Sequence, residues 1–501
     1  MSAAAEVSRD PRTGGRTRGP AVTAADEVAR LLARAARDAA PVAAAPPSVR
    51  AGWLEAVATA LERDAEELTV LADAETALGP DRLRGEVGRA AAQARFYGRV
   101  ASGGDWLGVR IDRADGVDLR RMNRPLGPVA VFGASNFPFA FGVVGHDTCS
   151  ALAAGCPVLA KAHPAHPRLS ARLAHTVAGA LADAGAPEGA FALVHGFDAG
   201  LALVDAPEVT AVAFTGSQSG GTALVERAAR RPVPVPVFAE MGTVNPAVLT
   251  PAAAADGAVL RAAASGFVAS FTLGQGQFCT KPGLLLAPRG SGAADEVAGA
   301  LAGVEPGWLL TEGIAAQYRQ GLADLEAAGA RPAASVPARA EGFAASPALF
   351  TAPASAFTPG SRLLAECFGP VALLAEYDGP DELRSLLGGL QPSLAAAVAS
   401  AGAGDPDVPW LVELLSGTAG RVVVDGWPTG VVTSWAQQHG GPWPATSRPE
   451  ATSVGAAALD RFTRPVAFQG VPPAALPEAL RDDNPWRLPR RIDGVPEEDV
   501  S

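Results

Sequence analysis

The sequence predicts an α/β fold in which parallel β-sheets are flanked by helices. Short apolar runs rich in Val, Leu and Phe alternate with longer stretches whose apolar residues recur at helical spacing. This alternation is typical of βαβ units and of a mainly parallel sheet. A second series of such elements begins near Pro246. The chain has 501 residues, 48% of them apolar, which is enough for two or three domains with sizeable cores.

The first fifth of the chain is predicted to be helical after a short arm. Residues 1–20 mix both charge signs with Gly and Pro and lack the apolar core of a signal peptide, so we expect a loose or hairpin-like arm. From residue 23 to residue 103 the apolar positions predict a run of amphipathic helices. Residues 105–124 have a strand-like pattern, and the compact apolar strand GPVAVFG follows directly.

The remaining elements follow from the same two patterns. In the first half the predicted strands are PVLAKA, FALVHG and VTAVAFTG, separated by the helix-like SARLAHTVAGALADAG and FDAGLALVDA. In the second half the helix-like stretches are ADGAVLRAAASGFVASF, AADEVAGALAGV and EGIAAQYRQGLADLEAAG, and the strands are GLLLAP, VALLAEY and AAAVAS. From residue 440 onward the chain is rich in Pro, contains the strand-like run RPVAFQG, and ends in an acidic stretch.

The composition argues against several classes of function. Charged residues make up only 19% of the chain and the formal net charge is −11, so a nucleic-acid partner is not expected. Three charge-free stretches, 125–145, 262–280 and 385–404, have the length of membrane spans. We interpret them as buried strands and loops, since the first contains three prolines, and we expect no membrane partner. The four cysteines form no CxxC pair and fit a reducing cytoplasm.

Two residues are candidates for acid–base and nucleophilic chemistry. Cys279 lies in the Gly-rich loop LGQGQFCTKPG, where the backbone can approach a ligand closely and a thiolate can attack a carbonyl. A buried structural cysteine is the alternative. Glu240 lies at the end of the apolar strand VPVFAEM, where a carboxylate is costly unless it is paired or neutralised. It is either a general base or one half of a salt bridge at the strand end.

Two further polar residues follow predicted strands. Asn136, in FGASNFPFAF, either donates its amide to an oxyanion or caps a turn. The string GASNF resembles the start of a GxSxG nucleophile elbow around Ser135, but Phe137 takes the second glycine position, which argues against an α/β-hydrolase. Lys161, at the end of the strand PVLAKA, either reaches solvent or binds a ribose or phosphate.

FTGSQSGG is the candidate phosphate-binding segment. It places Gly216, Ser217 and Gly221 at a strand-to-helix junction, where backbone NH groups can meet a phosphate, although it lacks the GxGxxG pattern. His163 and His166 have metal-like spacing, but prolines flank both and no carboxylate or thiol is near in sequence, so we expect no metal site. The other histidines are interpreted as structural or surface residues: His146, His175, His195 and His439.

The order of these motifs along nearly the whole chain resembles the aldehyde dehydrogenase superfamily. In sequence, the motifs are Asn136, Lys161, FTGS, Glu240, Cys279 and AECFGPVALL, which contains Glu366. Within that superfamily FAEMGTVNP, GQGQFCT and HGGPWPATS are most similar to the 2,5-dioxovalerate (α-ketoglutarate semialdehyde) dehydrogenases. Related NADP-dependent long-chain aldehyde dehydrogenases share several of these strings. The resemblance implies two parallel-sheet α/β domains and a small β extension used in oligomerisation.

The resemblance also implies the chemistry. Cys279 would attack the aldehyde to give a thiohemiacetal, whose oxyanion is held by the Asn136 amide and the Cys279 backbone NH. Hydride then passes to a nicotinamide. Glu240, with a pKa raised by burial, would activate the water that hydrolyses the resulting thioester to a carboxylate.

The implied cofactor is NADP, with NAD as the alternative. NAD-using members commonly have an acidic residue three positions after the lysine, where this chain has Pro164. Without a carboxylate to repel it, a 2′-phosphate can pair with the lysine. The implied cofactor-binding residues are Lys161 at the adenosine ribose, Gly216, Ser217 and Gly221 at the pyrophosphate, and Glu366 with Phe368 at the nicotinamide ribose.

Two features depart from the family pattern. The chain begins close to DPRTGG, so we expect the hairpin that usually precedes this point to be missing and the arm to be loosened. Lys281 is a cation where related sequences commonly carry a neutral side chain, and Lys161 is the only other lysine among the 41 basic residues. Pointing inward, Lys281 would lower the pKa of Cys279 or attract an anionic substrate; pointing outward, it would have no role.

The resemblance divides the chain and suggests a substrate. The favoured substrate is 2,5-dioxopentanoate, oxidised to 2-oxoglutarate. A medium or long aliphatic aldehyde is the first rival, since the apolar FPFAF and either Trp427 or Trp435 near the expected tunnel mouth suit a greasy chain. A non-redox thiol esterase or acyltransferase and a binding protein with a silent site are the others. The expected parts are a NAD(P)-binding domain (20–104 and 125–240), a catalytic domain (241–438), a bridging segment (105–124 and 439–470) that pairs subunits into a homodimer or homotetramer, an arm (1–19) and a tail (471–501).

Overall fold

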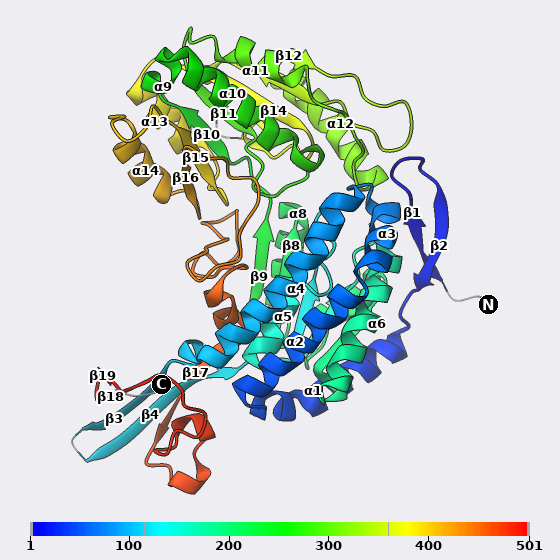
Figure 1. Cartoon of the computed structure of the whole chain (residues 1–501), viewed down its shortest axis with the longest axis vertical. Helices are drawn as coiled ribbons and strands as arrows, with labels where there is room; N and C mark the ends of the chain where they lie inside the picture. Colours follow the sequence, from blue (N-terminus) through cyan, green and yellow to red (C-terminus); the bar gives the residue numbers. More distant parts are fainter. Residues whose placement is uncertain (1–3, 115, 359, 498–501) are drawn as a thin grey trace.

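The computed structural model describes residues 4–114, 116–358 and 360–497 and consists of two α/β lobes and a smaller β extension (Figure 1). One lobe contains helices α1 to α8, and the other contains helices α9 to α14. The extension projects from the end of the first lobe that is remote from the second lobe (Figure 1). The expected fold class, two parallel-sheet α/β units with a small β extension, is confirmed.

The first lobe is built on a five-stranded sheet in the order β7-β6-β5-β8-β9, in which every pairing is parallel. Because the chain runs outward from β5 to β7 on one side and through β8 to β9 on the other, the strand order reverses between β5 and β8. Ligands bind at the carboxyl ends of strands at such a switch point. The strands are β5 (Val129–Phe132), β6 (Val158–Lys161), β7 (Phe191–Val194), β8 (Ala211–Gly216) and β9 (Val237–Met241).

Eight helices cover this sheet, as the apolar periodicity of the sequence predicts. The first four pack together, and α2 and α4 make the most extensive contact between elements. The helices are α1 (Ala25–Ala44), α2 (Pro47–Arg63), α3 (Ala65–Thr76), α4 (Pro80–Gly103), α5 (His146–Ala154), α6 (Pro167–Asp183), α7 (Phe197–Asp205) and α8 (Gln218–Ala229).

The second lobe contains a seven-stranded sheet in the order β12-β13-β14-β11-β10-β15-β16, in which only the edge strand β12 is antiparallel. Its strands are β10 (Pro246–Leu249), β11 (Leu284–Pro288), β12 (Arg331–Ser335), β13 (Ala348–Thr351), β14 (Val371–Tyr377), β15 (Ala396–Ala399) and β16 (Val422–Val424). Its helices are α9 (Pro251–Ala255), α10 (Gly257–Thr272), α11 (Ala293–Leu301), α12 (Glu312–Ala327), α13 (Pro380–Gly389) and α14 (Val408–Ser416).

Helix α10 and the turn after it form a 20-residue stretch, Gly257–Gly276, that is long and apolar enough to cross a membrane. It is the one such stretch among the residues that the structure describes. Phe267 and Phe271 on this helix are fully buried in the core of the second lobe, together with residues of β10, β11 and β14. The stretch therefore packs as a core helix of this lobe.

The extension is a five-stranded sheet in the order β17-β4-β3-β18-β19. Its strands are β3 (Val109–Ala114), β4 (Val117–Pro125), β17 (Thr463–Gln469), β18 (Arg490–Ile492) and β19 (Val495–Pro496). Strand β17 pairs with β4 along its whole length, from Thr463↔Pro125 to Gln469↔Leu119. The predicted tail thus contributes two strands to the same sheet as the predicted bridging segment.

The N-terminal arm corrects one expectation. Strand β1 (Ala5–Arg9) pairs with β2 (Arg16–Ala21), and DPRTGG forms the turn between them. The predicted absence of a hairpin is therefore wrong. The Asp10 carboxylate accepts hydrogen bonds from Arg12 N and Thr13 Oγ1, and Arg12 Nη2 lies 2.9 Å from Asp73 Oδ1 of α3, so the turn is held both internally and against the first lobe.

Candidate active site

A cavity of about 900 Å³ lies between the two lobes. The first lobe contributes the carboxyl ends of its strands, and the second contributes α12 and the loop that contains Glu366. Seven of the predicted site residues line the cavity: Asn136, Gly216, Ser217, Glu240, Cys279, Glu366 and Phe368. Lys161 and Gly221 do not line it.

The loop that presents Cys279 is fixed by backbone contacts. It lies between α10 and β11 and contains three consecutive residues with positive φ, Gly274, Gln275 and Gly276. A Cβ at Gly276 would lie 2.1 Å from the carbonyl oxygen of Gly369, so only glycine allows this close approach. The Asn245 side-chain amide donates to the carbonyl oxygens of Cys279 (2.8 Å) and Lys281 (3.1 Å). These contacts hold the thiol at the cavity wall.

Cys279, Glu240 and His439 form the centre of the site. His439 Nε2 lies 3.6 Å from Cys279 Sγ and 3.0 Å from Glu240 Oε2. Glu240 and His439 are almost completely buried, and the carboxylate has the proximity of an ion pair without the alignment of a hydrogen bond. Burial and the neighbouring carboxylate of Glu240 raise the pKa of the Cys279 thiol well above its ordinary value. The resting site therefore contains a thiol beside a possible proton acceptor.

His439 was missed as a site residue by the sequence analysis, which interpreted it as structural or surface. Its position is set by the segment 439–454: the His439 backbone NH donates to Thr452 Oγ1 (2.8 Å) and its carbonyl accepts from Ser453 N (3.0 Å). A Cβ at Gly441 would lie 2.5 Å from the Ser393 carbonyl oxygen, so the backbone after His439 passes close to the second lobe. The string HGGPWPATS was noted, and its two glycines were the available signal.

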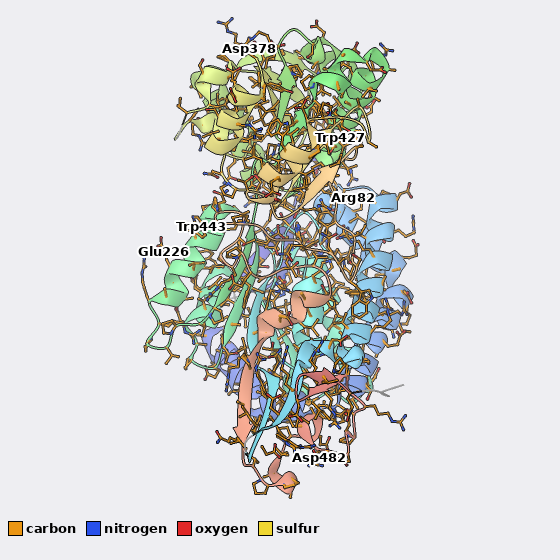
Figure 2. All side chains as sticks on the ribbon, turned by 90° about the vertical axis from the view of Figure 1, so that its left-hand side faces the viewer. Arg82, Glu226, Asp378, Trp427, Trp443 and Asp482 are labelled. Atoms are coloured by element: carbon orange, nitrogen blue, oxygen red, sulfur yellow. The ribbon has the colours of Figure 1, made fainter. Side chains whose placement is uncertain are left out.

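Asn136 contacts the nucleophile loop through its backbone neighbours. Its amide Nδ2 donates to the carbonyl oxygen of Gln277 (2.8 Å), and its own carbonyl accepts from Arg82 Nη2 (2.7 Å). Figure 2 shows Arg82 at the level where the two lobes meet. The ring of Phe137 meets the ring of Phe278 edge-on at 5.0 Å. Asn136 is thus held against the loop of Cys279, and the second N–H of its amide is available for an oxyanion.

The loop that contains Glu366 is anchored by Lys281. Lys281 Nζ donates to the carbonyl oxygens of Cys367 (2.8 Å), Gly369 (3.1 Å) and Val371 (2.8 Å). The side chain points inward, but its ammonium group is used for these three carbonyls. Lys281 therefore positions the backbone that follows Glu366, a role that neither sequence alternative included.

The Glu366 carboxyl group faces the cavity without a hydrogen bond to Oε1. Burial raises its pKa to about 7, against the opposing effect of the Lys281 ammonium. Gly242 makes room for this carboxyl group, since a Cβ there would lie 2.3 Å from Glu366 Oε2. A buried acid with an unused oxygen in a cavity wall suits a ligand hydroxyl, such as that of a ribose.

The predicted phosphate segment has the expected location. Ser217 is the N-cap of α8 and its Oγ accepts from Gly220 N (3.2 Å), while Gly216 ends β8. Gly221 has a different part: a Cβ there would lie 2.5 Å from Met241 Sδ, so this glycine permits close packing of α8 on β9. Gln218, which the sequence analysis did not single out, donates to the carbonyl of Gly242 (2.9 Å).

Lys161 ends β6 beside a carboxylate that comes from the N-terminal hairpin. Lys161 pairs in register with Val194, the last residue of β7. The next residues, His195 and Gly196, bind the Glu6 carboxylate through His195 Nδ1 (3.0 Å) and Gly196 N (3.0 Å). Burial lowers the pKa of Lys161, and the charge of Glu6 opposes this effect. A carboxylate is thus present near Lys161 although residue 164 is proline.

Among the described residues, one group brings three metal-ligating side chains together, and it is Glu240, Cys279 and His439, whose ligand atoms lie within 4.8 Å of one another. The rings of His163 and His166 lie 5.6 Å apart. The His163 Nδ1 accepts from Ala165 N (3.1 Å) and His166 Nδ1 lies 3.3 Å from Ser170 Oγ. Both rings therefore serve the turn before α6.

The fold and this site define the class of protein, and the comparisons with known proteins agree. Residues 4–407 match the model of the aldehyde dehydrogenase family, and the chain belongs to that family. It is an oxidoreductase that oxidises aldehydes with a nicotinamide dinucleotide, NAD or NADP.

Two curated relatives match most of the chain. It is 45% identical over 492 residues to alpha-ketoglutaric semialdehyde dehydrogenase 2 of Azospirillum brasilense, which covers 96% of this chain and 93% of the relative. It is 41% identical over 462 residues to alpha-ketoglutaric semialdehyde dehydrogenase of Acinetobacter baylyi, with 89% and 87% covered. The solved structure of an NAD-dependent aldehyde dehydrogenase from Sinorhizobium meliloti superposes with a TM-score of 0.80 at 24% identity, covering 94% of this chain and 92% of that one.

Proposed function

We propose that the chain oxidises 2,5-dioxopentanoate to 2-oxoglutarate with NADP, through a thioester on Cys279. The observation that carries the proposal is the contact of Cys279 Sγ with His439 Nε2 (3.6 Å), which is itself 3.0 Å from Glu240 Oε2. A nucleophile next to a base that contacts a second acid is the arrangement that covalent catalysis requires. The names of the two curated relatives support the substrate.

The first half of the reaction forms the carbon–sulfur bond. Because the pKa of Cys279 is high, the thiol must lose its proton as the sulfur adds to the aldehyde carbon. His439 Nε2 receives this proton, and the adjacent Glu240 carboxylate stabilises the resulting imidazolium. The aldehyde oxygen gains negative charge, which the backbone NH of Cys279 and the second N–H of the Asn136 amide hold. When bound, the nicotinamide dinucleotide supplies the hydride acceptor.

The second half breaks the carbon–sulfur bond. Glu240, alone or through His439, removes a proton from a water molecule that adds to the thioester carbon. Cys279 leaves as a thiolate and regains its proton as the carboxylate departs. The net change adds one oxygen from water and removes one hydride and the accompanying protons, so the aldehyde carbon becomes a carboxylate.

The residues present fit a dinucleotide. The cavity of about 900 Å³ lies at the strand-order switch point, where the N-terminus of α8 offers backbone NH groups for the pyrophosphate. Ser217 and Gly216 line the same part of the cavity. The buried Oε1 of Glu366, which has no partner, is available for the nicotinamide ribose, with Phe368 beside it.

The choice between NADP and NAD depends on opposing charges. Pro164 lines the cavity and contributes no acid, so Lys161 can pair with a 2′-phosphate. The hydrogen-bonded Glu6 carboxylate lies on the same edge of the sheet and disfavours that phosphate. We therefore propose NADP as the preferred cofactor, with NAD also used because of Glu6.

Formation of reduced nicotinamide from 2,5-dioxopentanoate tests the proposal. We expect turnover by the wild-type chain with either nicotinamide cofactor, and none by Cys279→Ala under the same conditions. Ester hydrolysis by the wild-type chain without aldehyde oxidation would contradict it and favour the non-redox thiol esterase or acyltransferase. Unchanged activity in Cys279→Ala would place the chemistry elsewhere.

A medium or long aliphatic aldehyde remains the second candidate substrate, and an apolar cluster favours it. Phe137, Phe141, Phe278 and Val431 are buried together beside Cys279. Trp427 does not add to this tunnel: it lies in the second lobe (Figure 2), with its ring 5.6 Å from that of Phe267 in the core. Comparing 2,5-dioxopentanoate with decanal at equal concentration decides between the two substrates.

The arrangement of sheets supports a proposal for the domains, the assembly and the location. We propose the predicted division, with the tail strands β18 and β19 added to the bridging segment because they belong to its sheet. Strand β17 is an edge of that sheet, and an exposed edge favours pairing between subunits of a homodimer or homotetramer. The free cysteines, Cys149 and Cys156 among them, suit a reducing cytoplasm.

A further inference from the structure

Two arginine side chains, one from each lobe, converge on the loop 428–431. Arg89 belongs to α4, and its Nη2 donates to the carbonyl oxygen of Val431 (2.6 Å). Arg421 directly precedes β16, and its Nη2 donates to the carbonyl oxygens of Pro428 and Gly430, the latter at 3.0 Å. Both side chains are partly buried. Two positive charges are thus brought together at one loop.

This loop lies beside the nucleophile. Val431 packs in the apolar cluster with Phe137, Phe141 and Phe278, and Phe278 is the residue before Cys279. The guanidinium carbon of Arg89 lies 5.6 Å from the centre of the Phe137 ring. Burial lowers the pKa of Arg89 and of Arg421, and in both cases a negative charge on Cys279 opposes that effect. Both guanidinium groups are therefore near enough to interact electrostatically with the reacting sulfur.

Neither arginine forms an ion pair with any carboxylate in the described parts of the chain. Buried cations elsewhere in the molecule are paired, as Arg461 is with Asp147 at 2.7 Å. The acid nearest in sequence to Arg89 is Glu86, one turn earlier on α4. Its Oε1 instead accepts from the backbone NH groups of Phe139 (2.9 Å) and Ala140 (3.0 Å), and burial raises its pKa. Partly buried guanidinium groups without a counter-ion indicate that an anion binds there.

We propose that Arg89 and Arg421 form a carboxylate-binding subsite, which selects short aldehydes that carry a carboxylate at the far end of the chain. The inference rests on the proposed function, since it identifies the substrate class of the same site. A guanidinium group binds a carboxylate through two parallel N–H···O bonds, and two such groups from different lobes fix both its position and its direction. The apolar cluster then contacts the methylene carbons, and the aldehyde points to Cys279.

The subsite explains how the same tunnel can be apolar and still prefer an oxo acid. The aromatic rings exclude water from the substrate chain, which strengthens the attraction between the carboxylate and the two cations. An aliphatic aldehyde would bury its chain against the same rings but leave the guanidinium groups without a partner. The discrimination therefore depends on the charge at the end of the substrate rather than on chain length.

The test compares two aldehydes of equal carbon number, 2,5-dioxopentanoate and pentanal, at saturating cofactor. The variants are Arg89→Gln and Arg421→Gln, with Arg89→Lys as the charge-retaining variant and Arg99→Gln, an exposed position on the same helix, as the matched control. We expect each Gln variant to lower kcat/KM for 2,5-dioxopentanoate by roughly 10- to 100-fold. We expect kcat/KM for pentanal to change by less than about twofold, because pentanal has no charge to lose.

A binding measurement separates this inference from the catalytic proposal. Glutarate has the carboxylate but no aldehyde, and its Kd can be measured by calorimetry without turnover. We expect both Gln variants to weaken glutarate binding by roughly 10-fold or more, Arg89→Lys to weaken it less, and Arg99→Gln to leave it unchanged. Equal losses for both aldehydes, or unchanged glutarate binding, would overturn the subsite. If the wild-type chain oxidises neither aldehyde but binds glutarate through these arginines, then the proposed function fails and the subsite stands.

Discussion

At the residue scale, the reactivity of Cys279 is governed by what surrounds it. Cys279 Sγ, His439 Nε2 and the carboxylate of Glu240 occupy one small space, and Glu240 contributes to the raised pKa of the thiol. Electrostatic repulsion between a thiolate and this carboxylate keeps the proton on the sulfur until substrate is present. The same carboxylate that delays thiolate formation is available for the later removal of a proton from water.

Replacement of Glu240 by Gln should therefore make the free enzyme more reactive toward alkylating agents. Removing the carboxylate charge lowers the pKa of the thiol, so we expect the midpoint of the alkylation rate against pH to fall by about one unit or more in Glu240→Gln. The rate is measured with iodoacetamide on the cofactor-free protein. Cys279→Ser is the control, because burial raises the pKa of Cys149 to about 12 and that of Cys156 to about 11. An unchanged midpoint would show that Glu240 does not control the thiol.

The second prediction at this scale concerns Glu6. If its carboxylate disfavours a 2′-phosphate next to Lys161, Glu6→Gln raises the ratio of kcat/KM with NADP to kcat/KM with NAD. A rise of about 5- to 10-fold corresponds to the interaction expected for two partly screened charges. Glu188→Gln, exposed on the same lobe, is a suitable control. A ratio that stays constant while both activities persist would remove Glu6 from cofactor selection.

At the scale of elements, the parallel sheets made most of the site predictable. Strands ended by polar residues meet at one sheet edge, so Asn136, Glu240 and Gly216 could be grouped from their places after apolar runs. His439 could not, because it is 160 positions from Cys279 and belongs to no strand. The hairpin β1–β2 was missed because its strands are short and mostly exposed, so they lack the alternation that marks a half-buried strand. The role of Lys281 depends on a contact across 86 to 90 positions.

Lys281 makes an element-scale prediction, since its three hydrogen bonds hold the loop after Glu366. In Lys281→Met the carbonyl oxygens of Cys367, Gly369 and Val371 lose their donor. We expect a loss of about 2 to 4 kcal/mol in the free energy of unfolding and a raised KM for the cofactor, because the loop carries Glu366. Thermal unfolding and steady-state kinetics measure the two effects. A stable variant with a normal KM for the cofactor would contradict the positioning role.

At the scale of the whole molecule, the N-terminal hairpin joins the two lobes. Arg9 contacts Glu312 at the start of α12, and Phe343 N donates to the Pro11 carbonyl oxygen (2.8 Å), while Arg12 is paired with α3 of the first lobe. In Figure 1 the hairpin lies beside both α12 and α3. The hairpin thus ties the two walls of the cofactor cavity together, and it also delivers Glu6 to Lys161.

The extension predicts assembly of the whole molecule. The edge strand β17 presents one unpaired side in the described sheet, remote from the cavity (Figure 1). We expect sedimentation to give the mass of a homodimer or homotetramer at micromolar concentration, because an edge of seven residues can pair with its symmetry mate. A monomer under those conditions would show that this edge is not an interface.

The central claim, oxidation of an oxo-acid aldehyde through a thioester on Cys279, has one direct test. Glu240→Gln is mixed with 2,5-dioxopentanoate and NADP, and intact-mass spectrometry is recorded together with the absorbance of the reduced nicotinamide. The account predicts that one equivalent of reduced nicotinamide forms rapidly and that an acyl adduct accumulates on Cys279, because the water-activating carboxylate is missing. Reduced nicotinamide without an adduct on Cys279, or no reduced nicotinamide from the wild-type chain, would contradict the account.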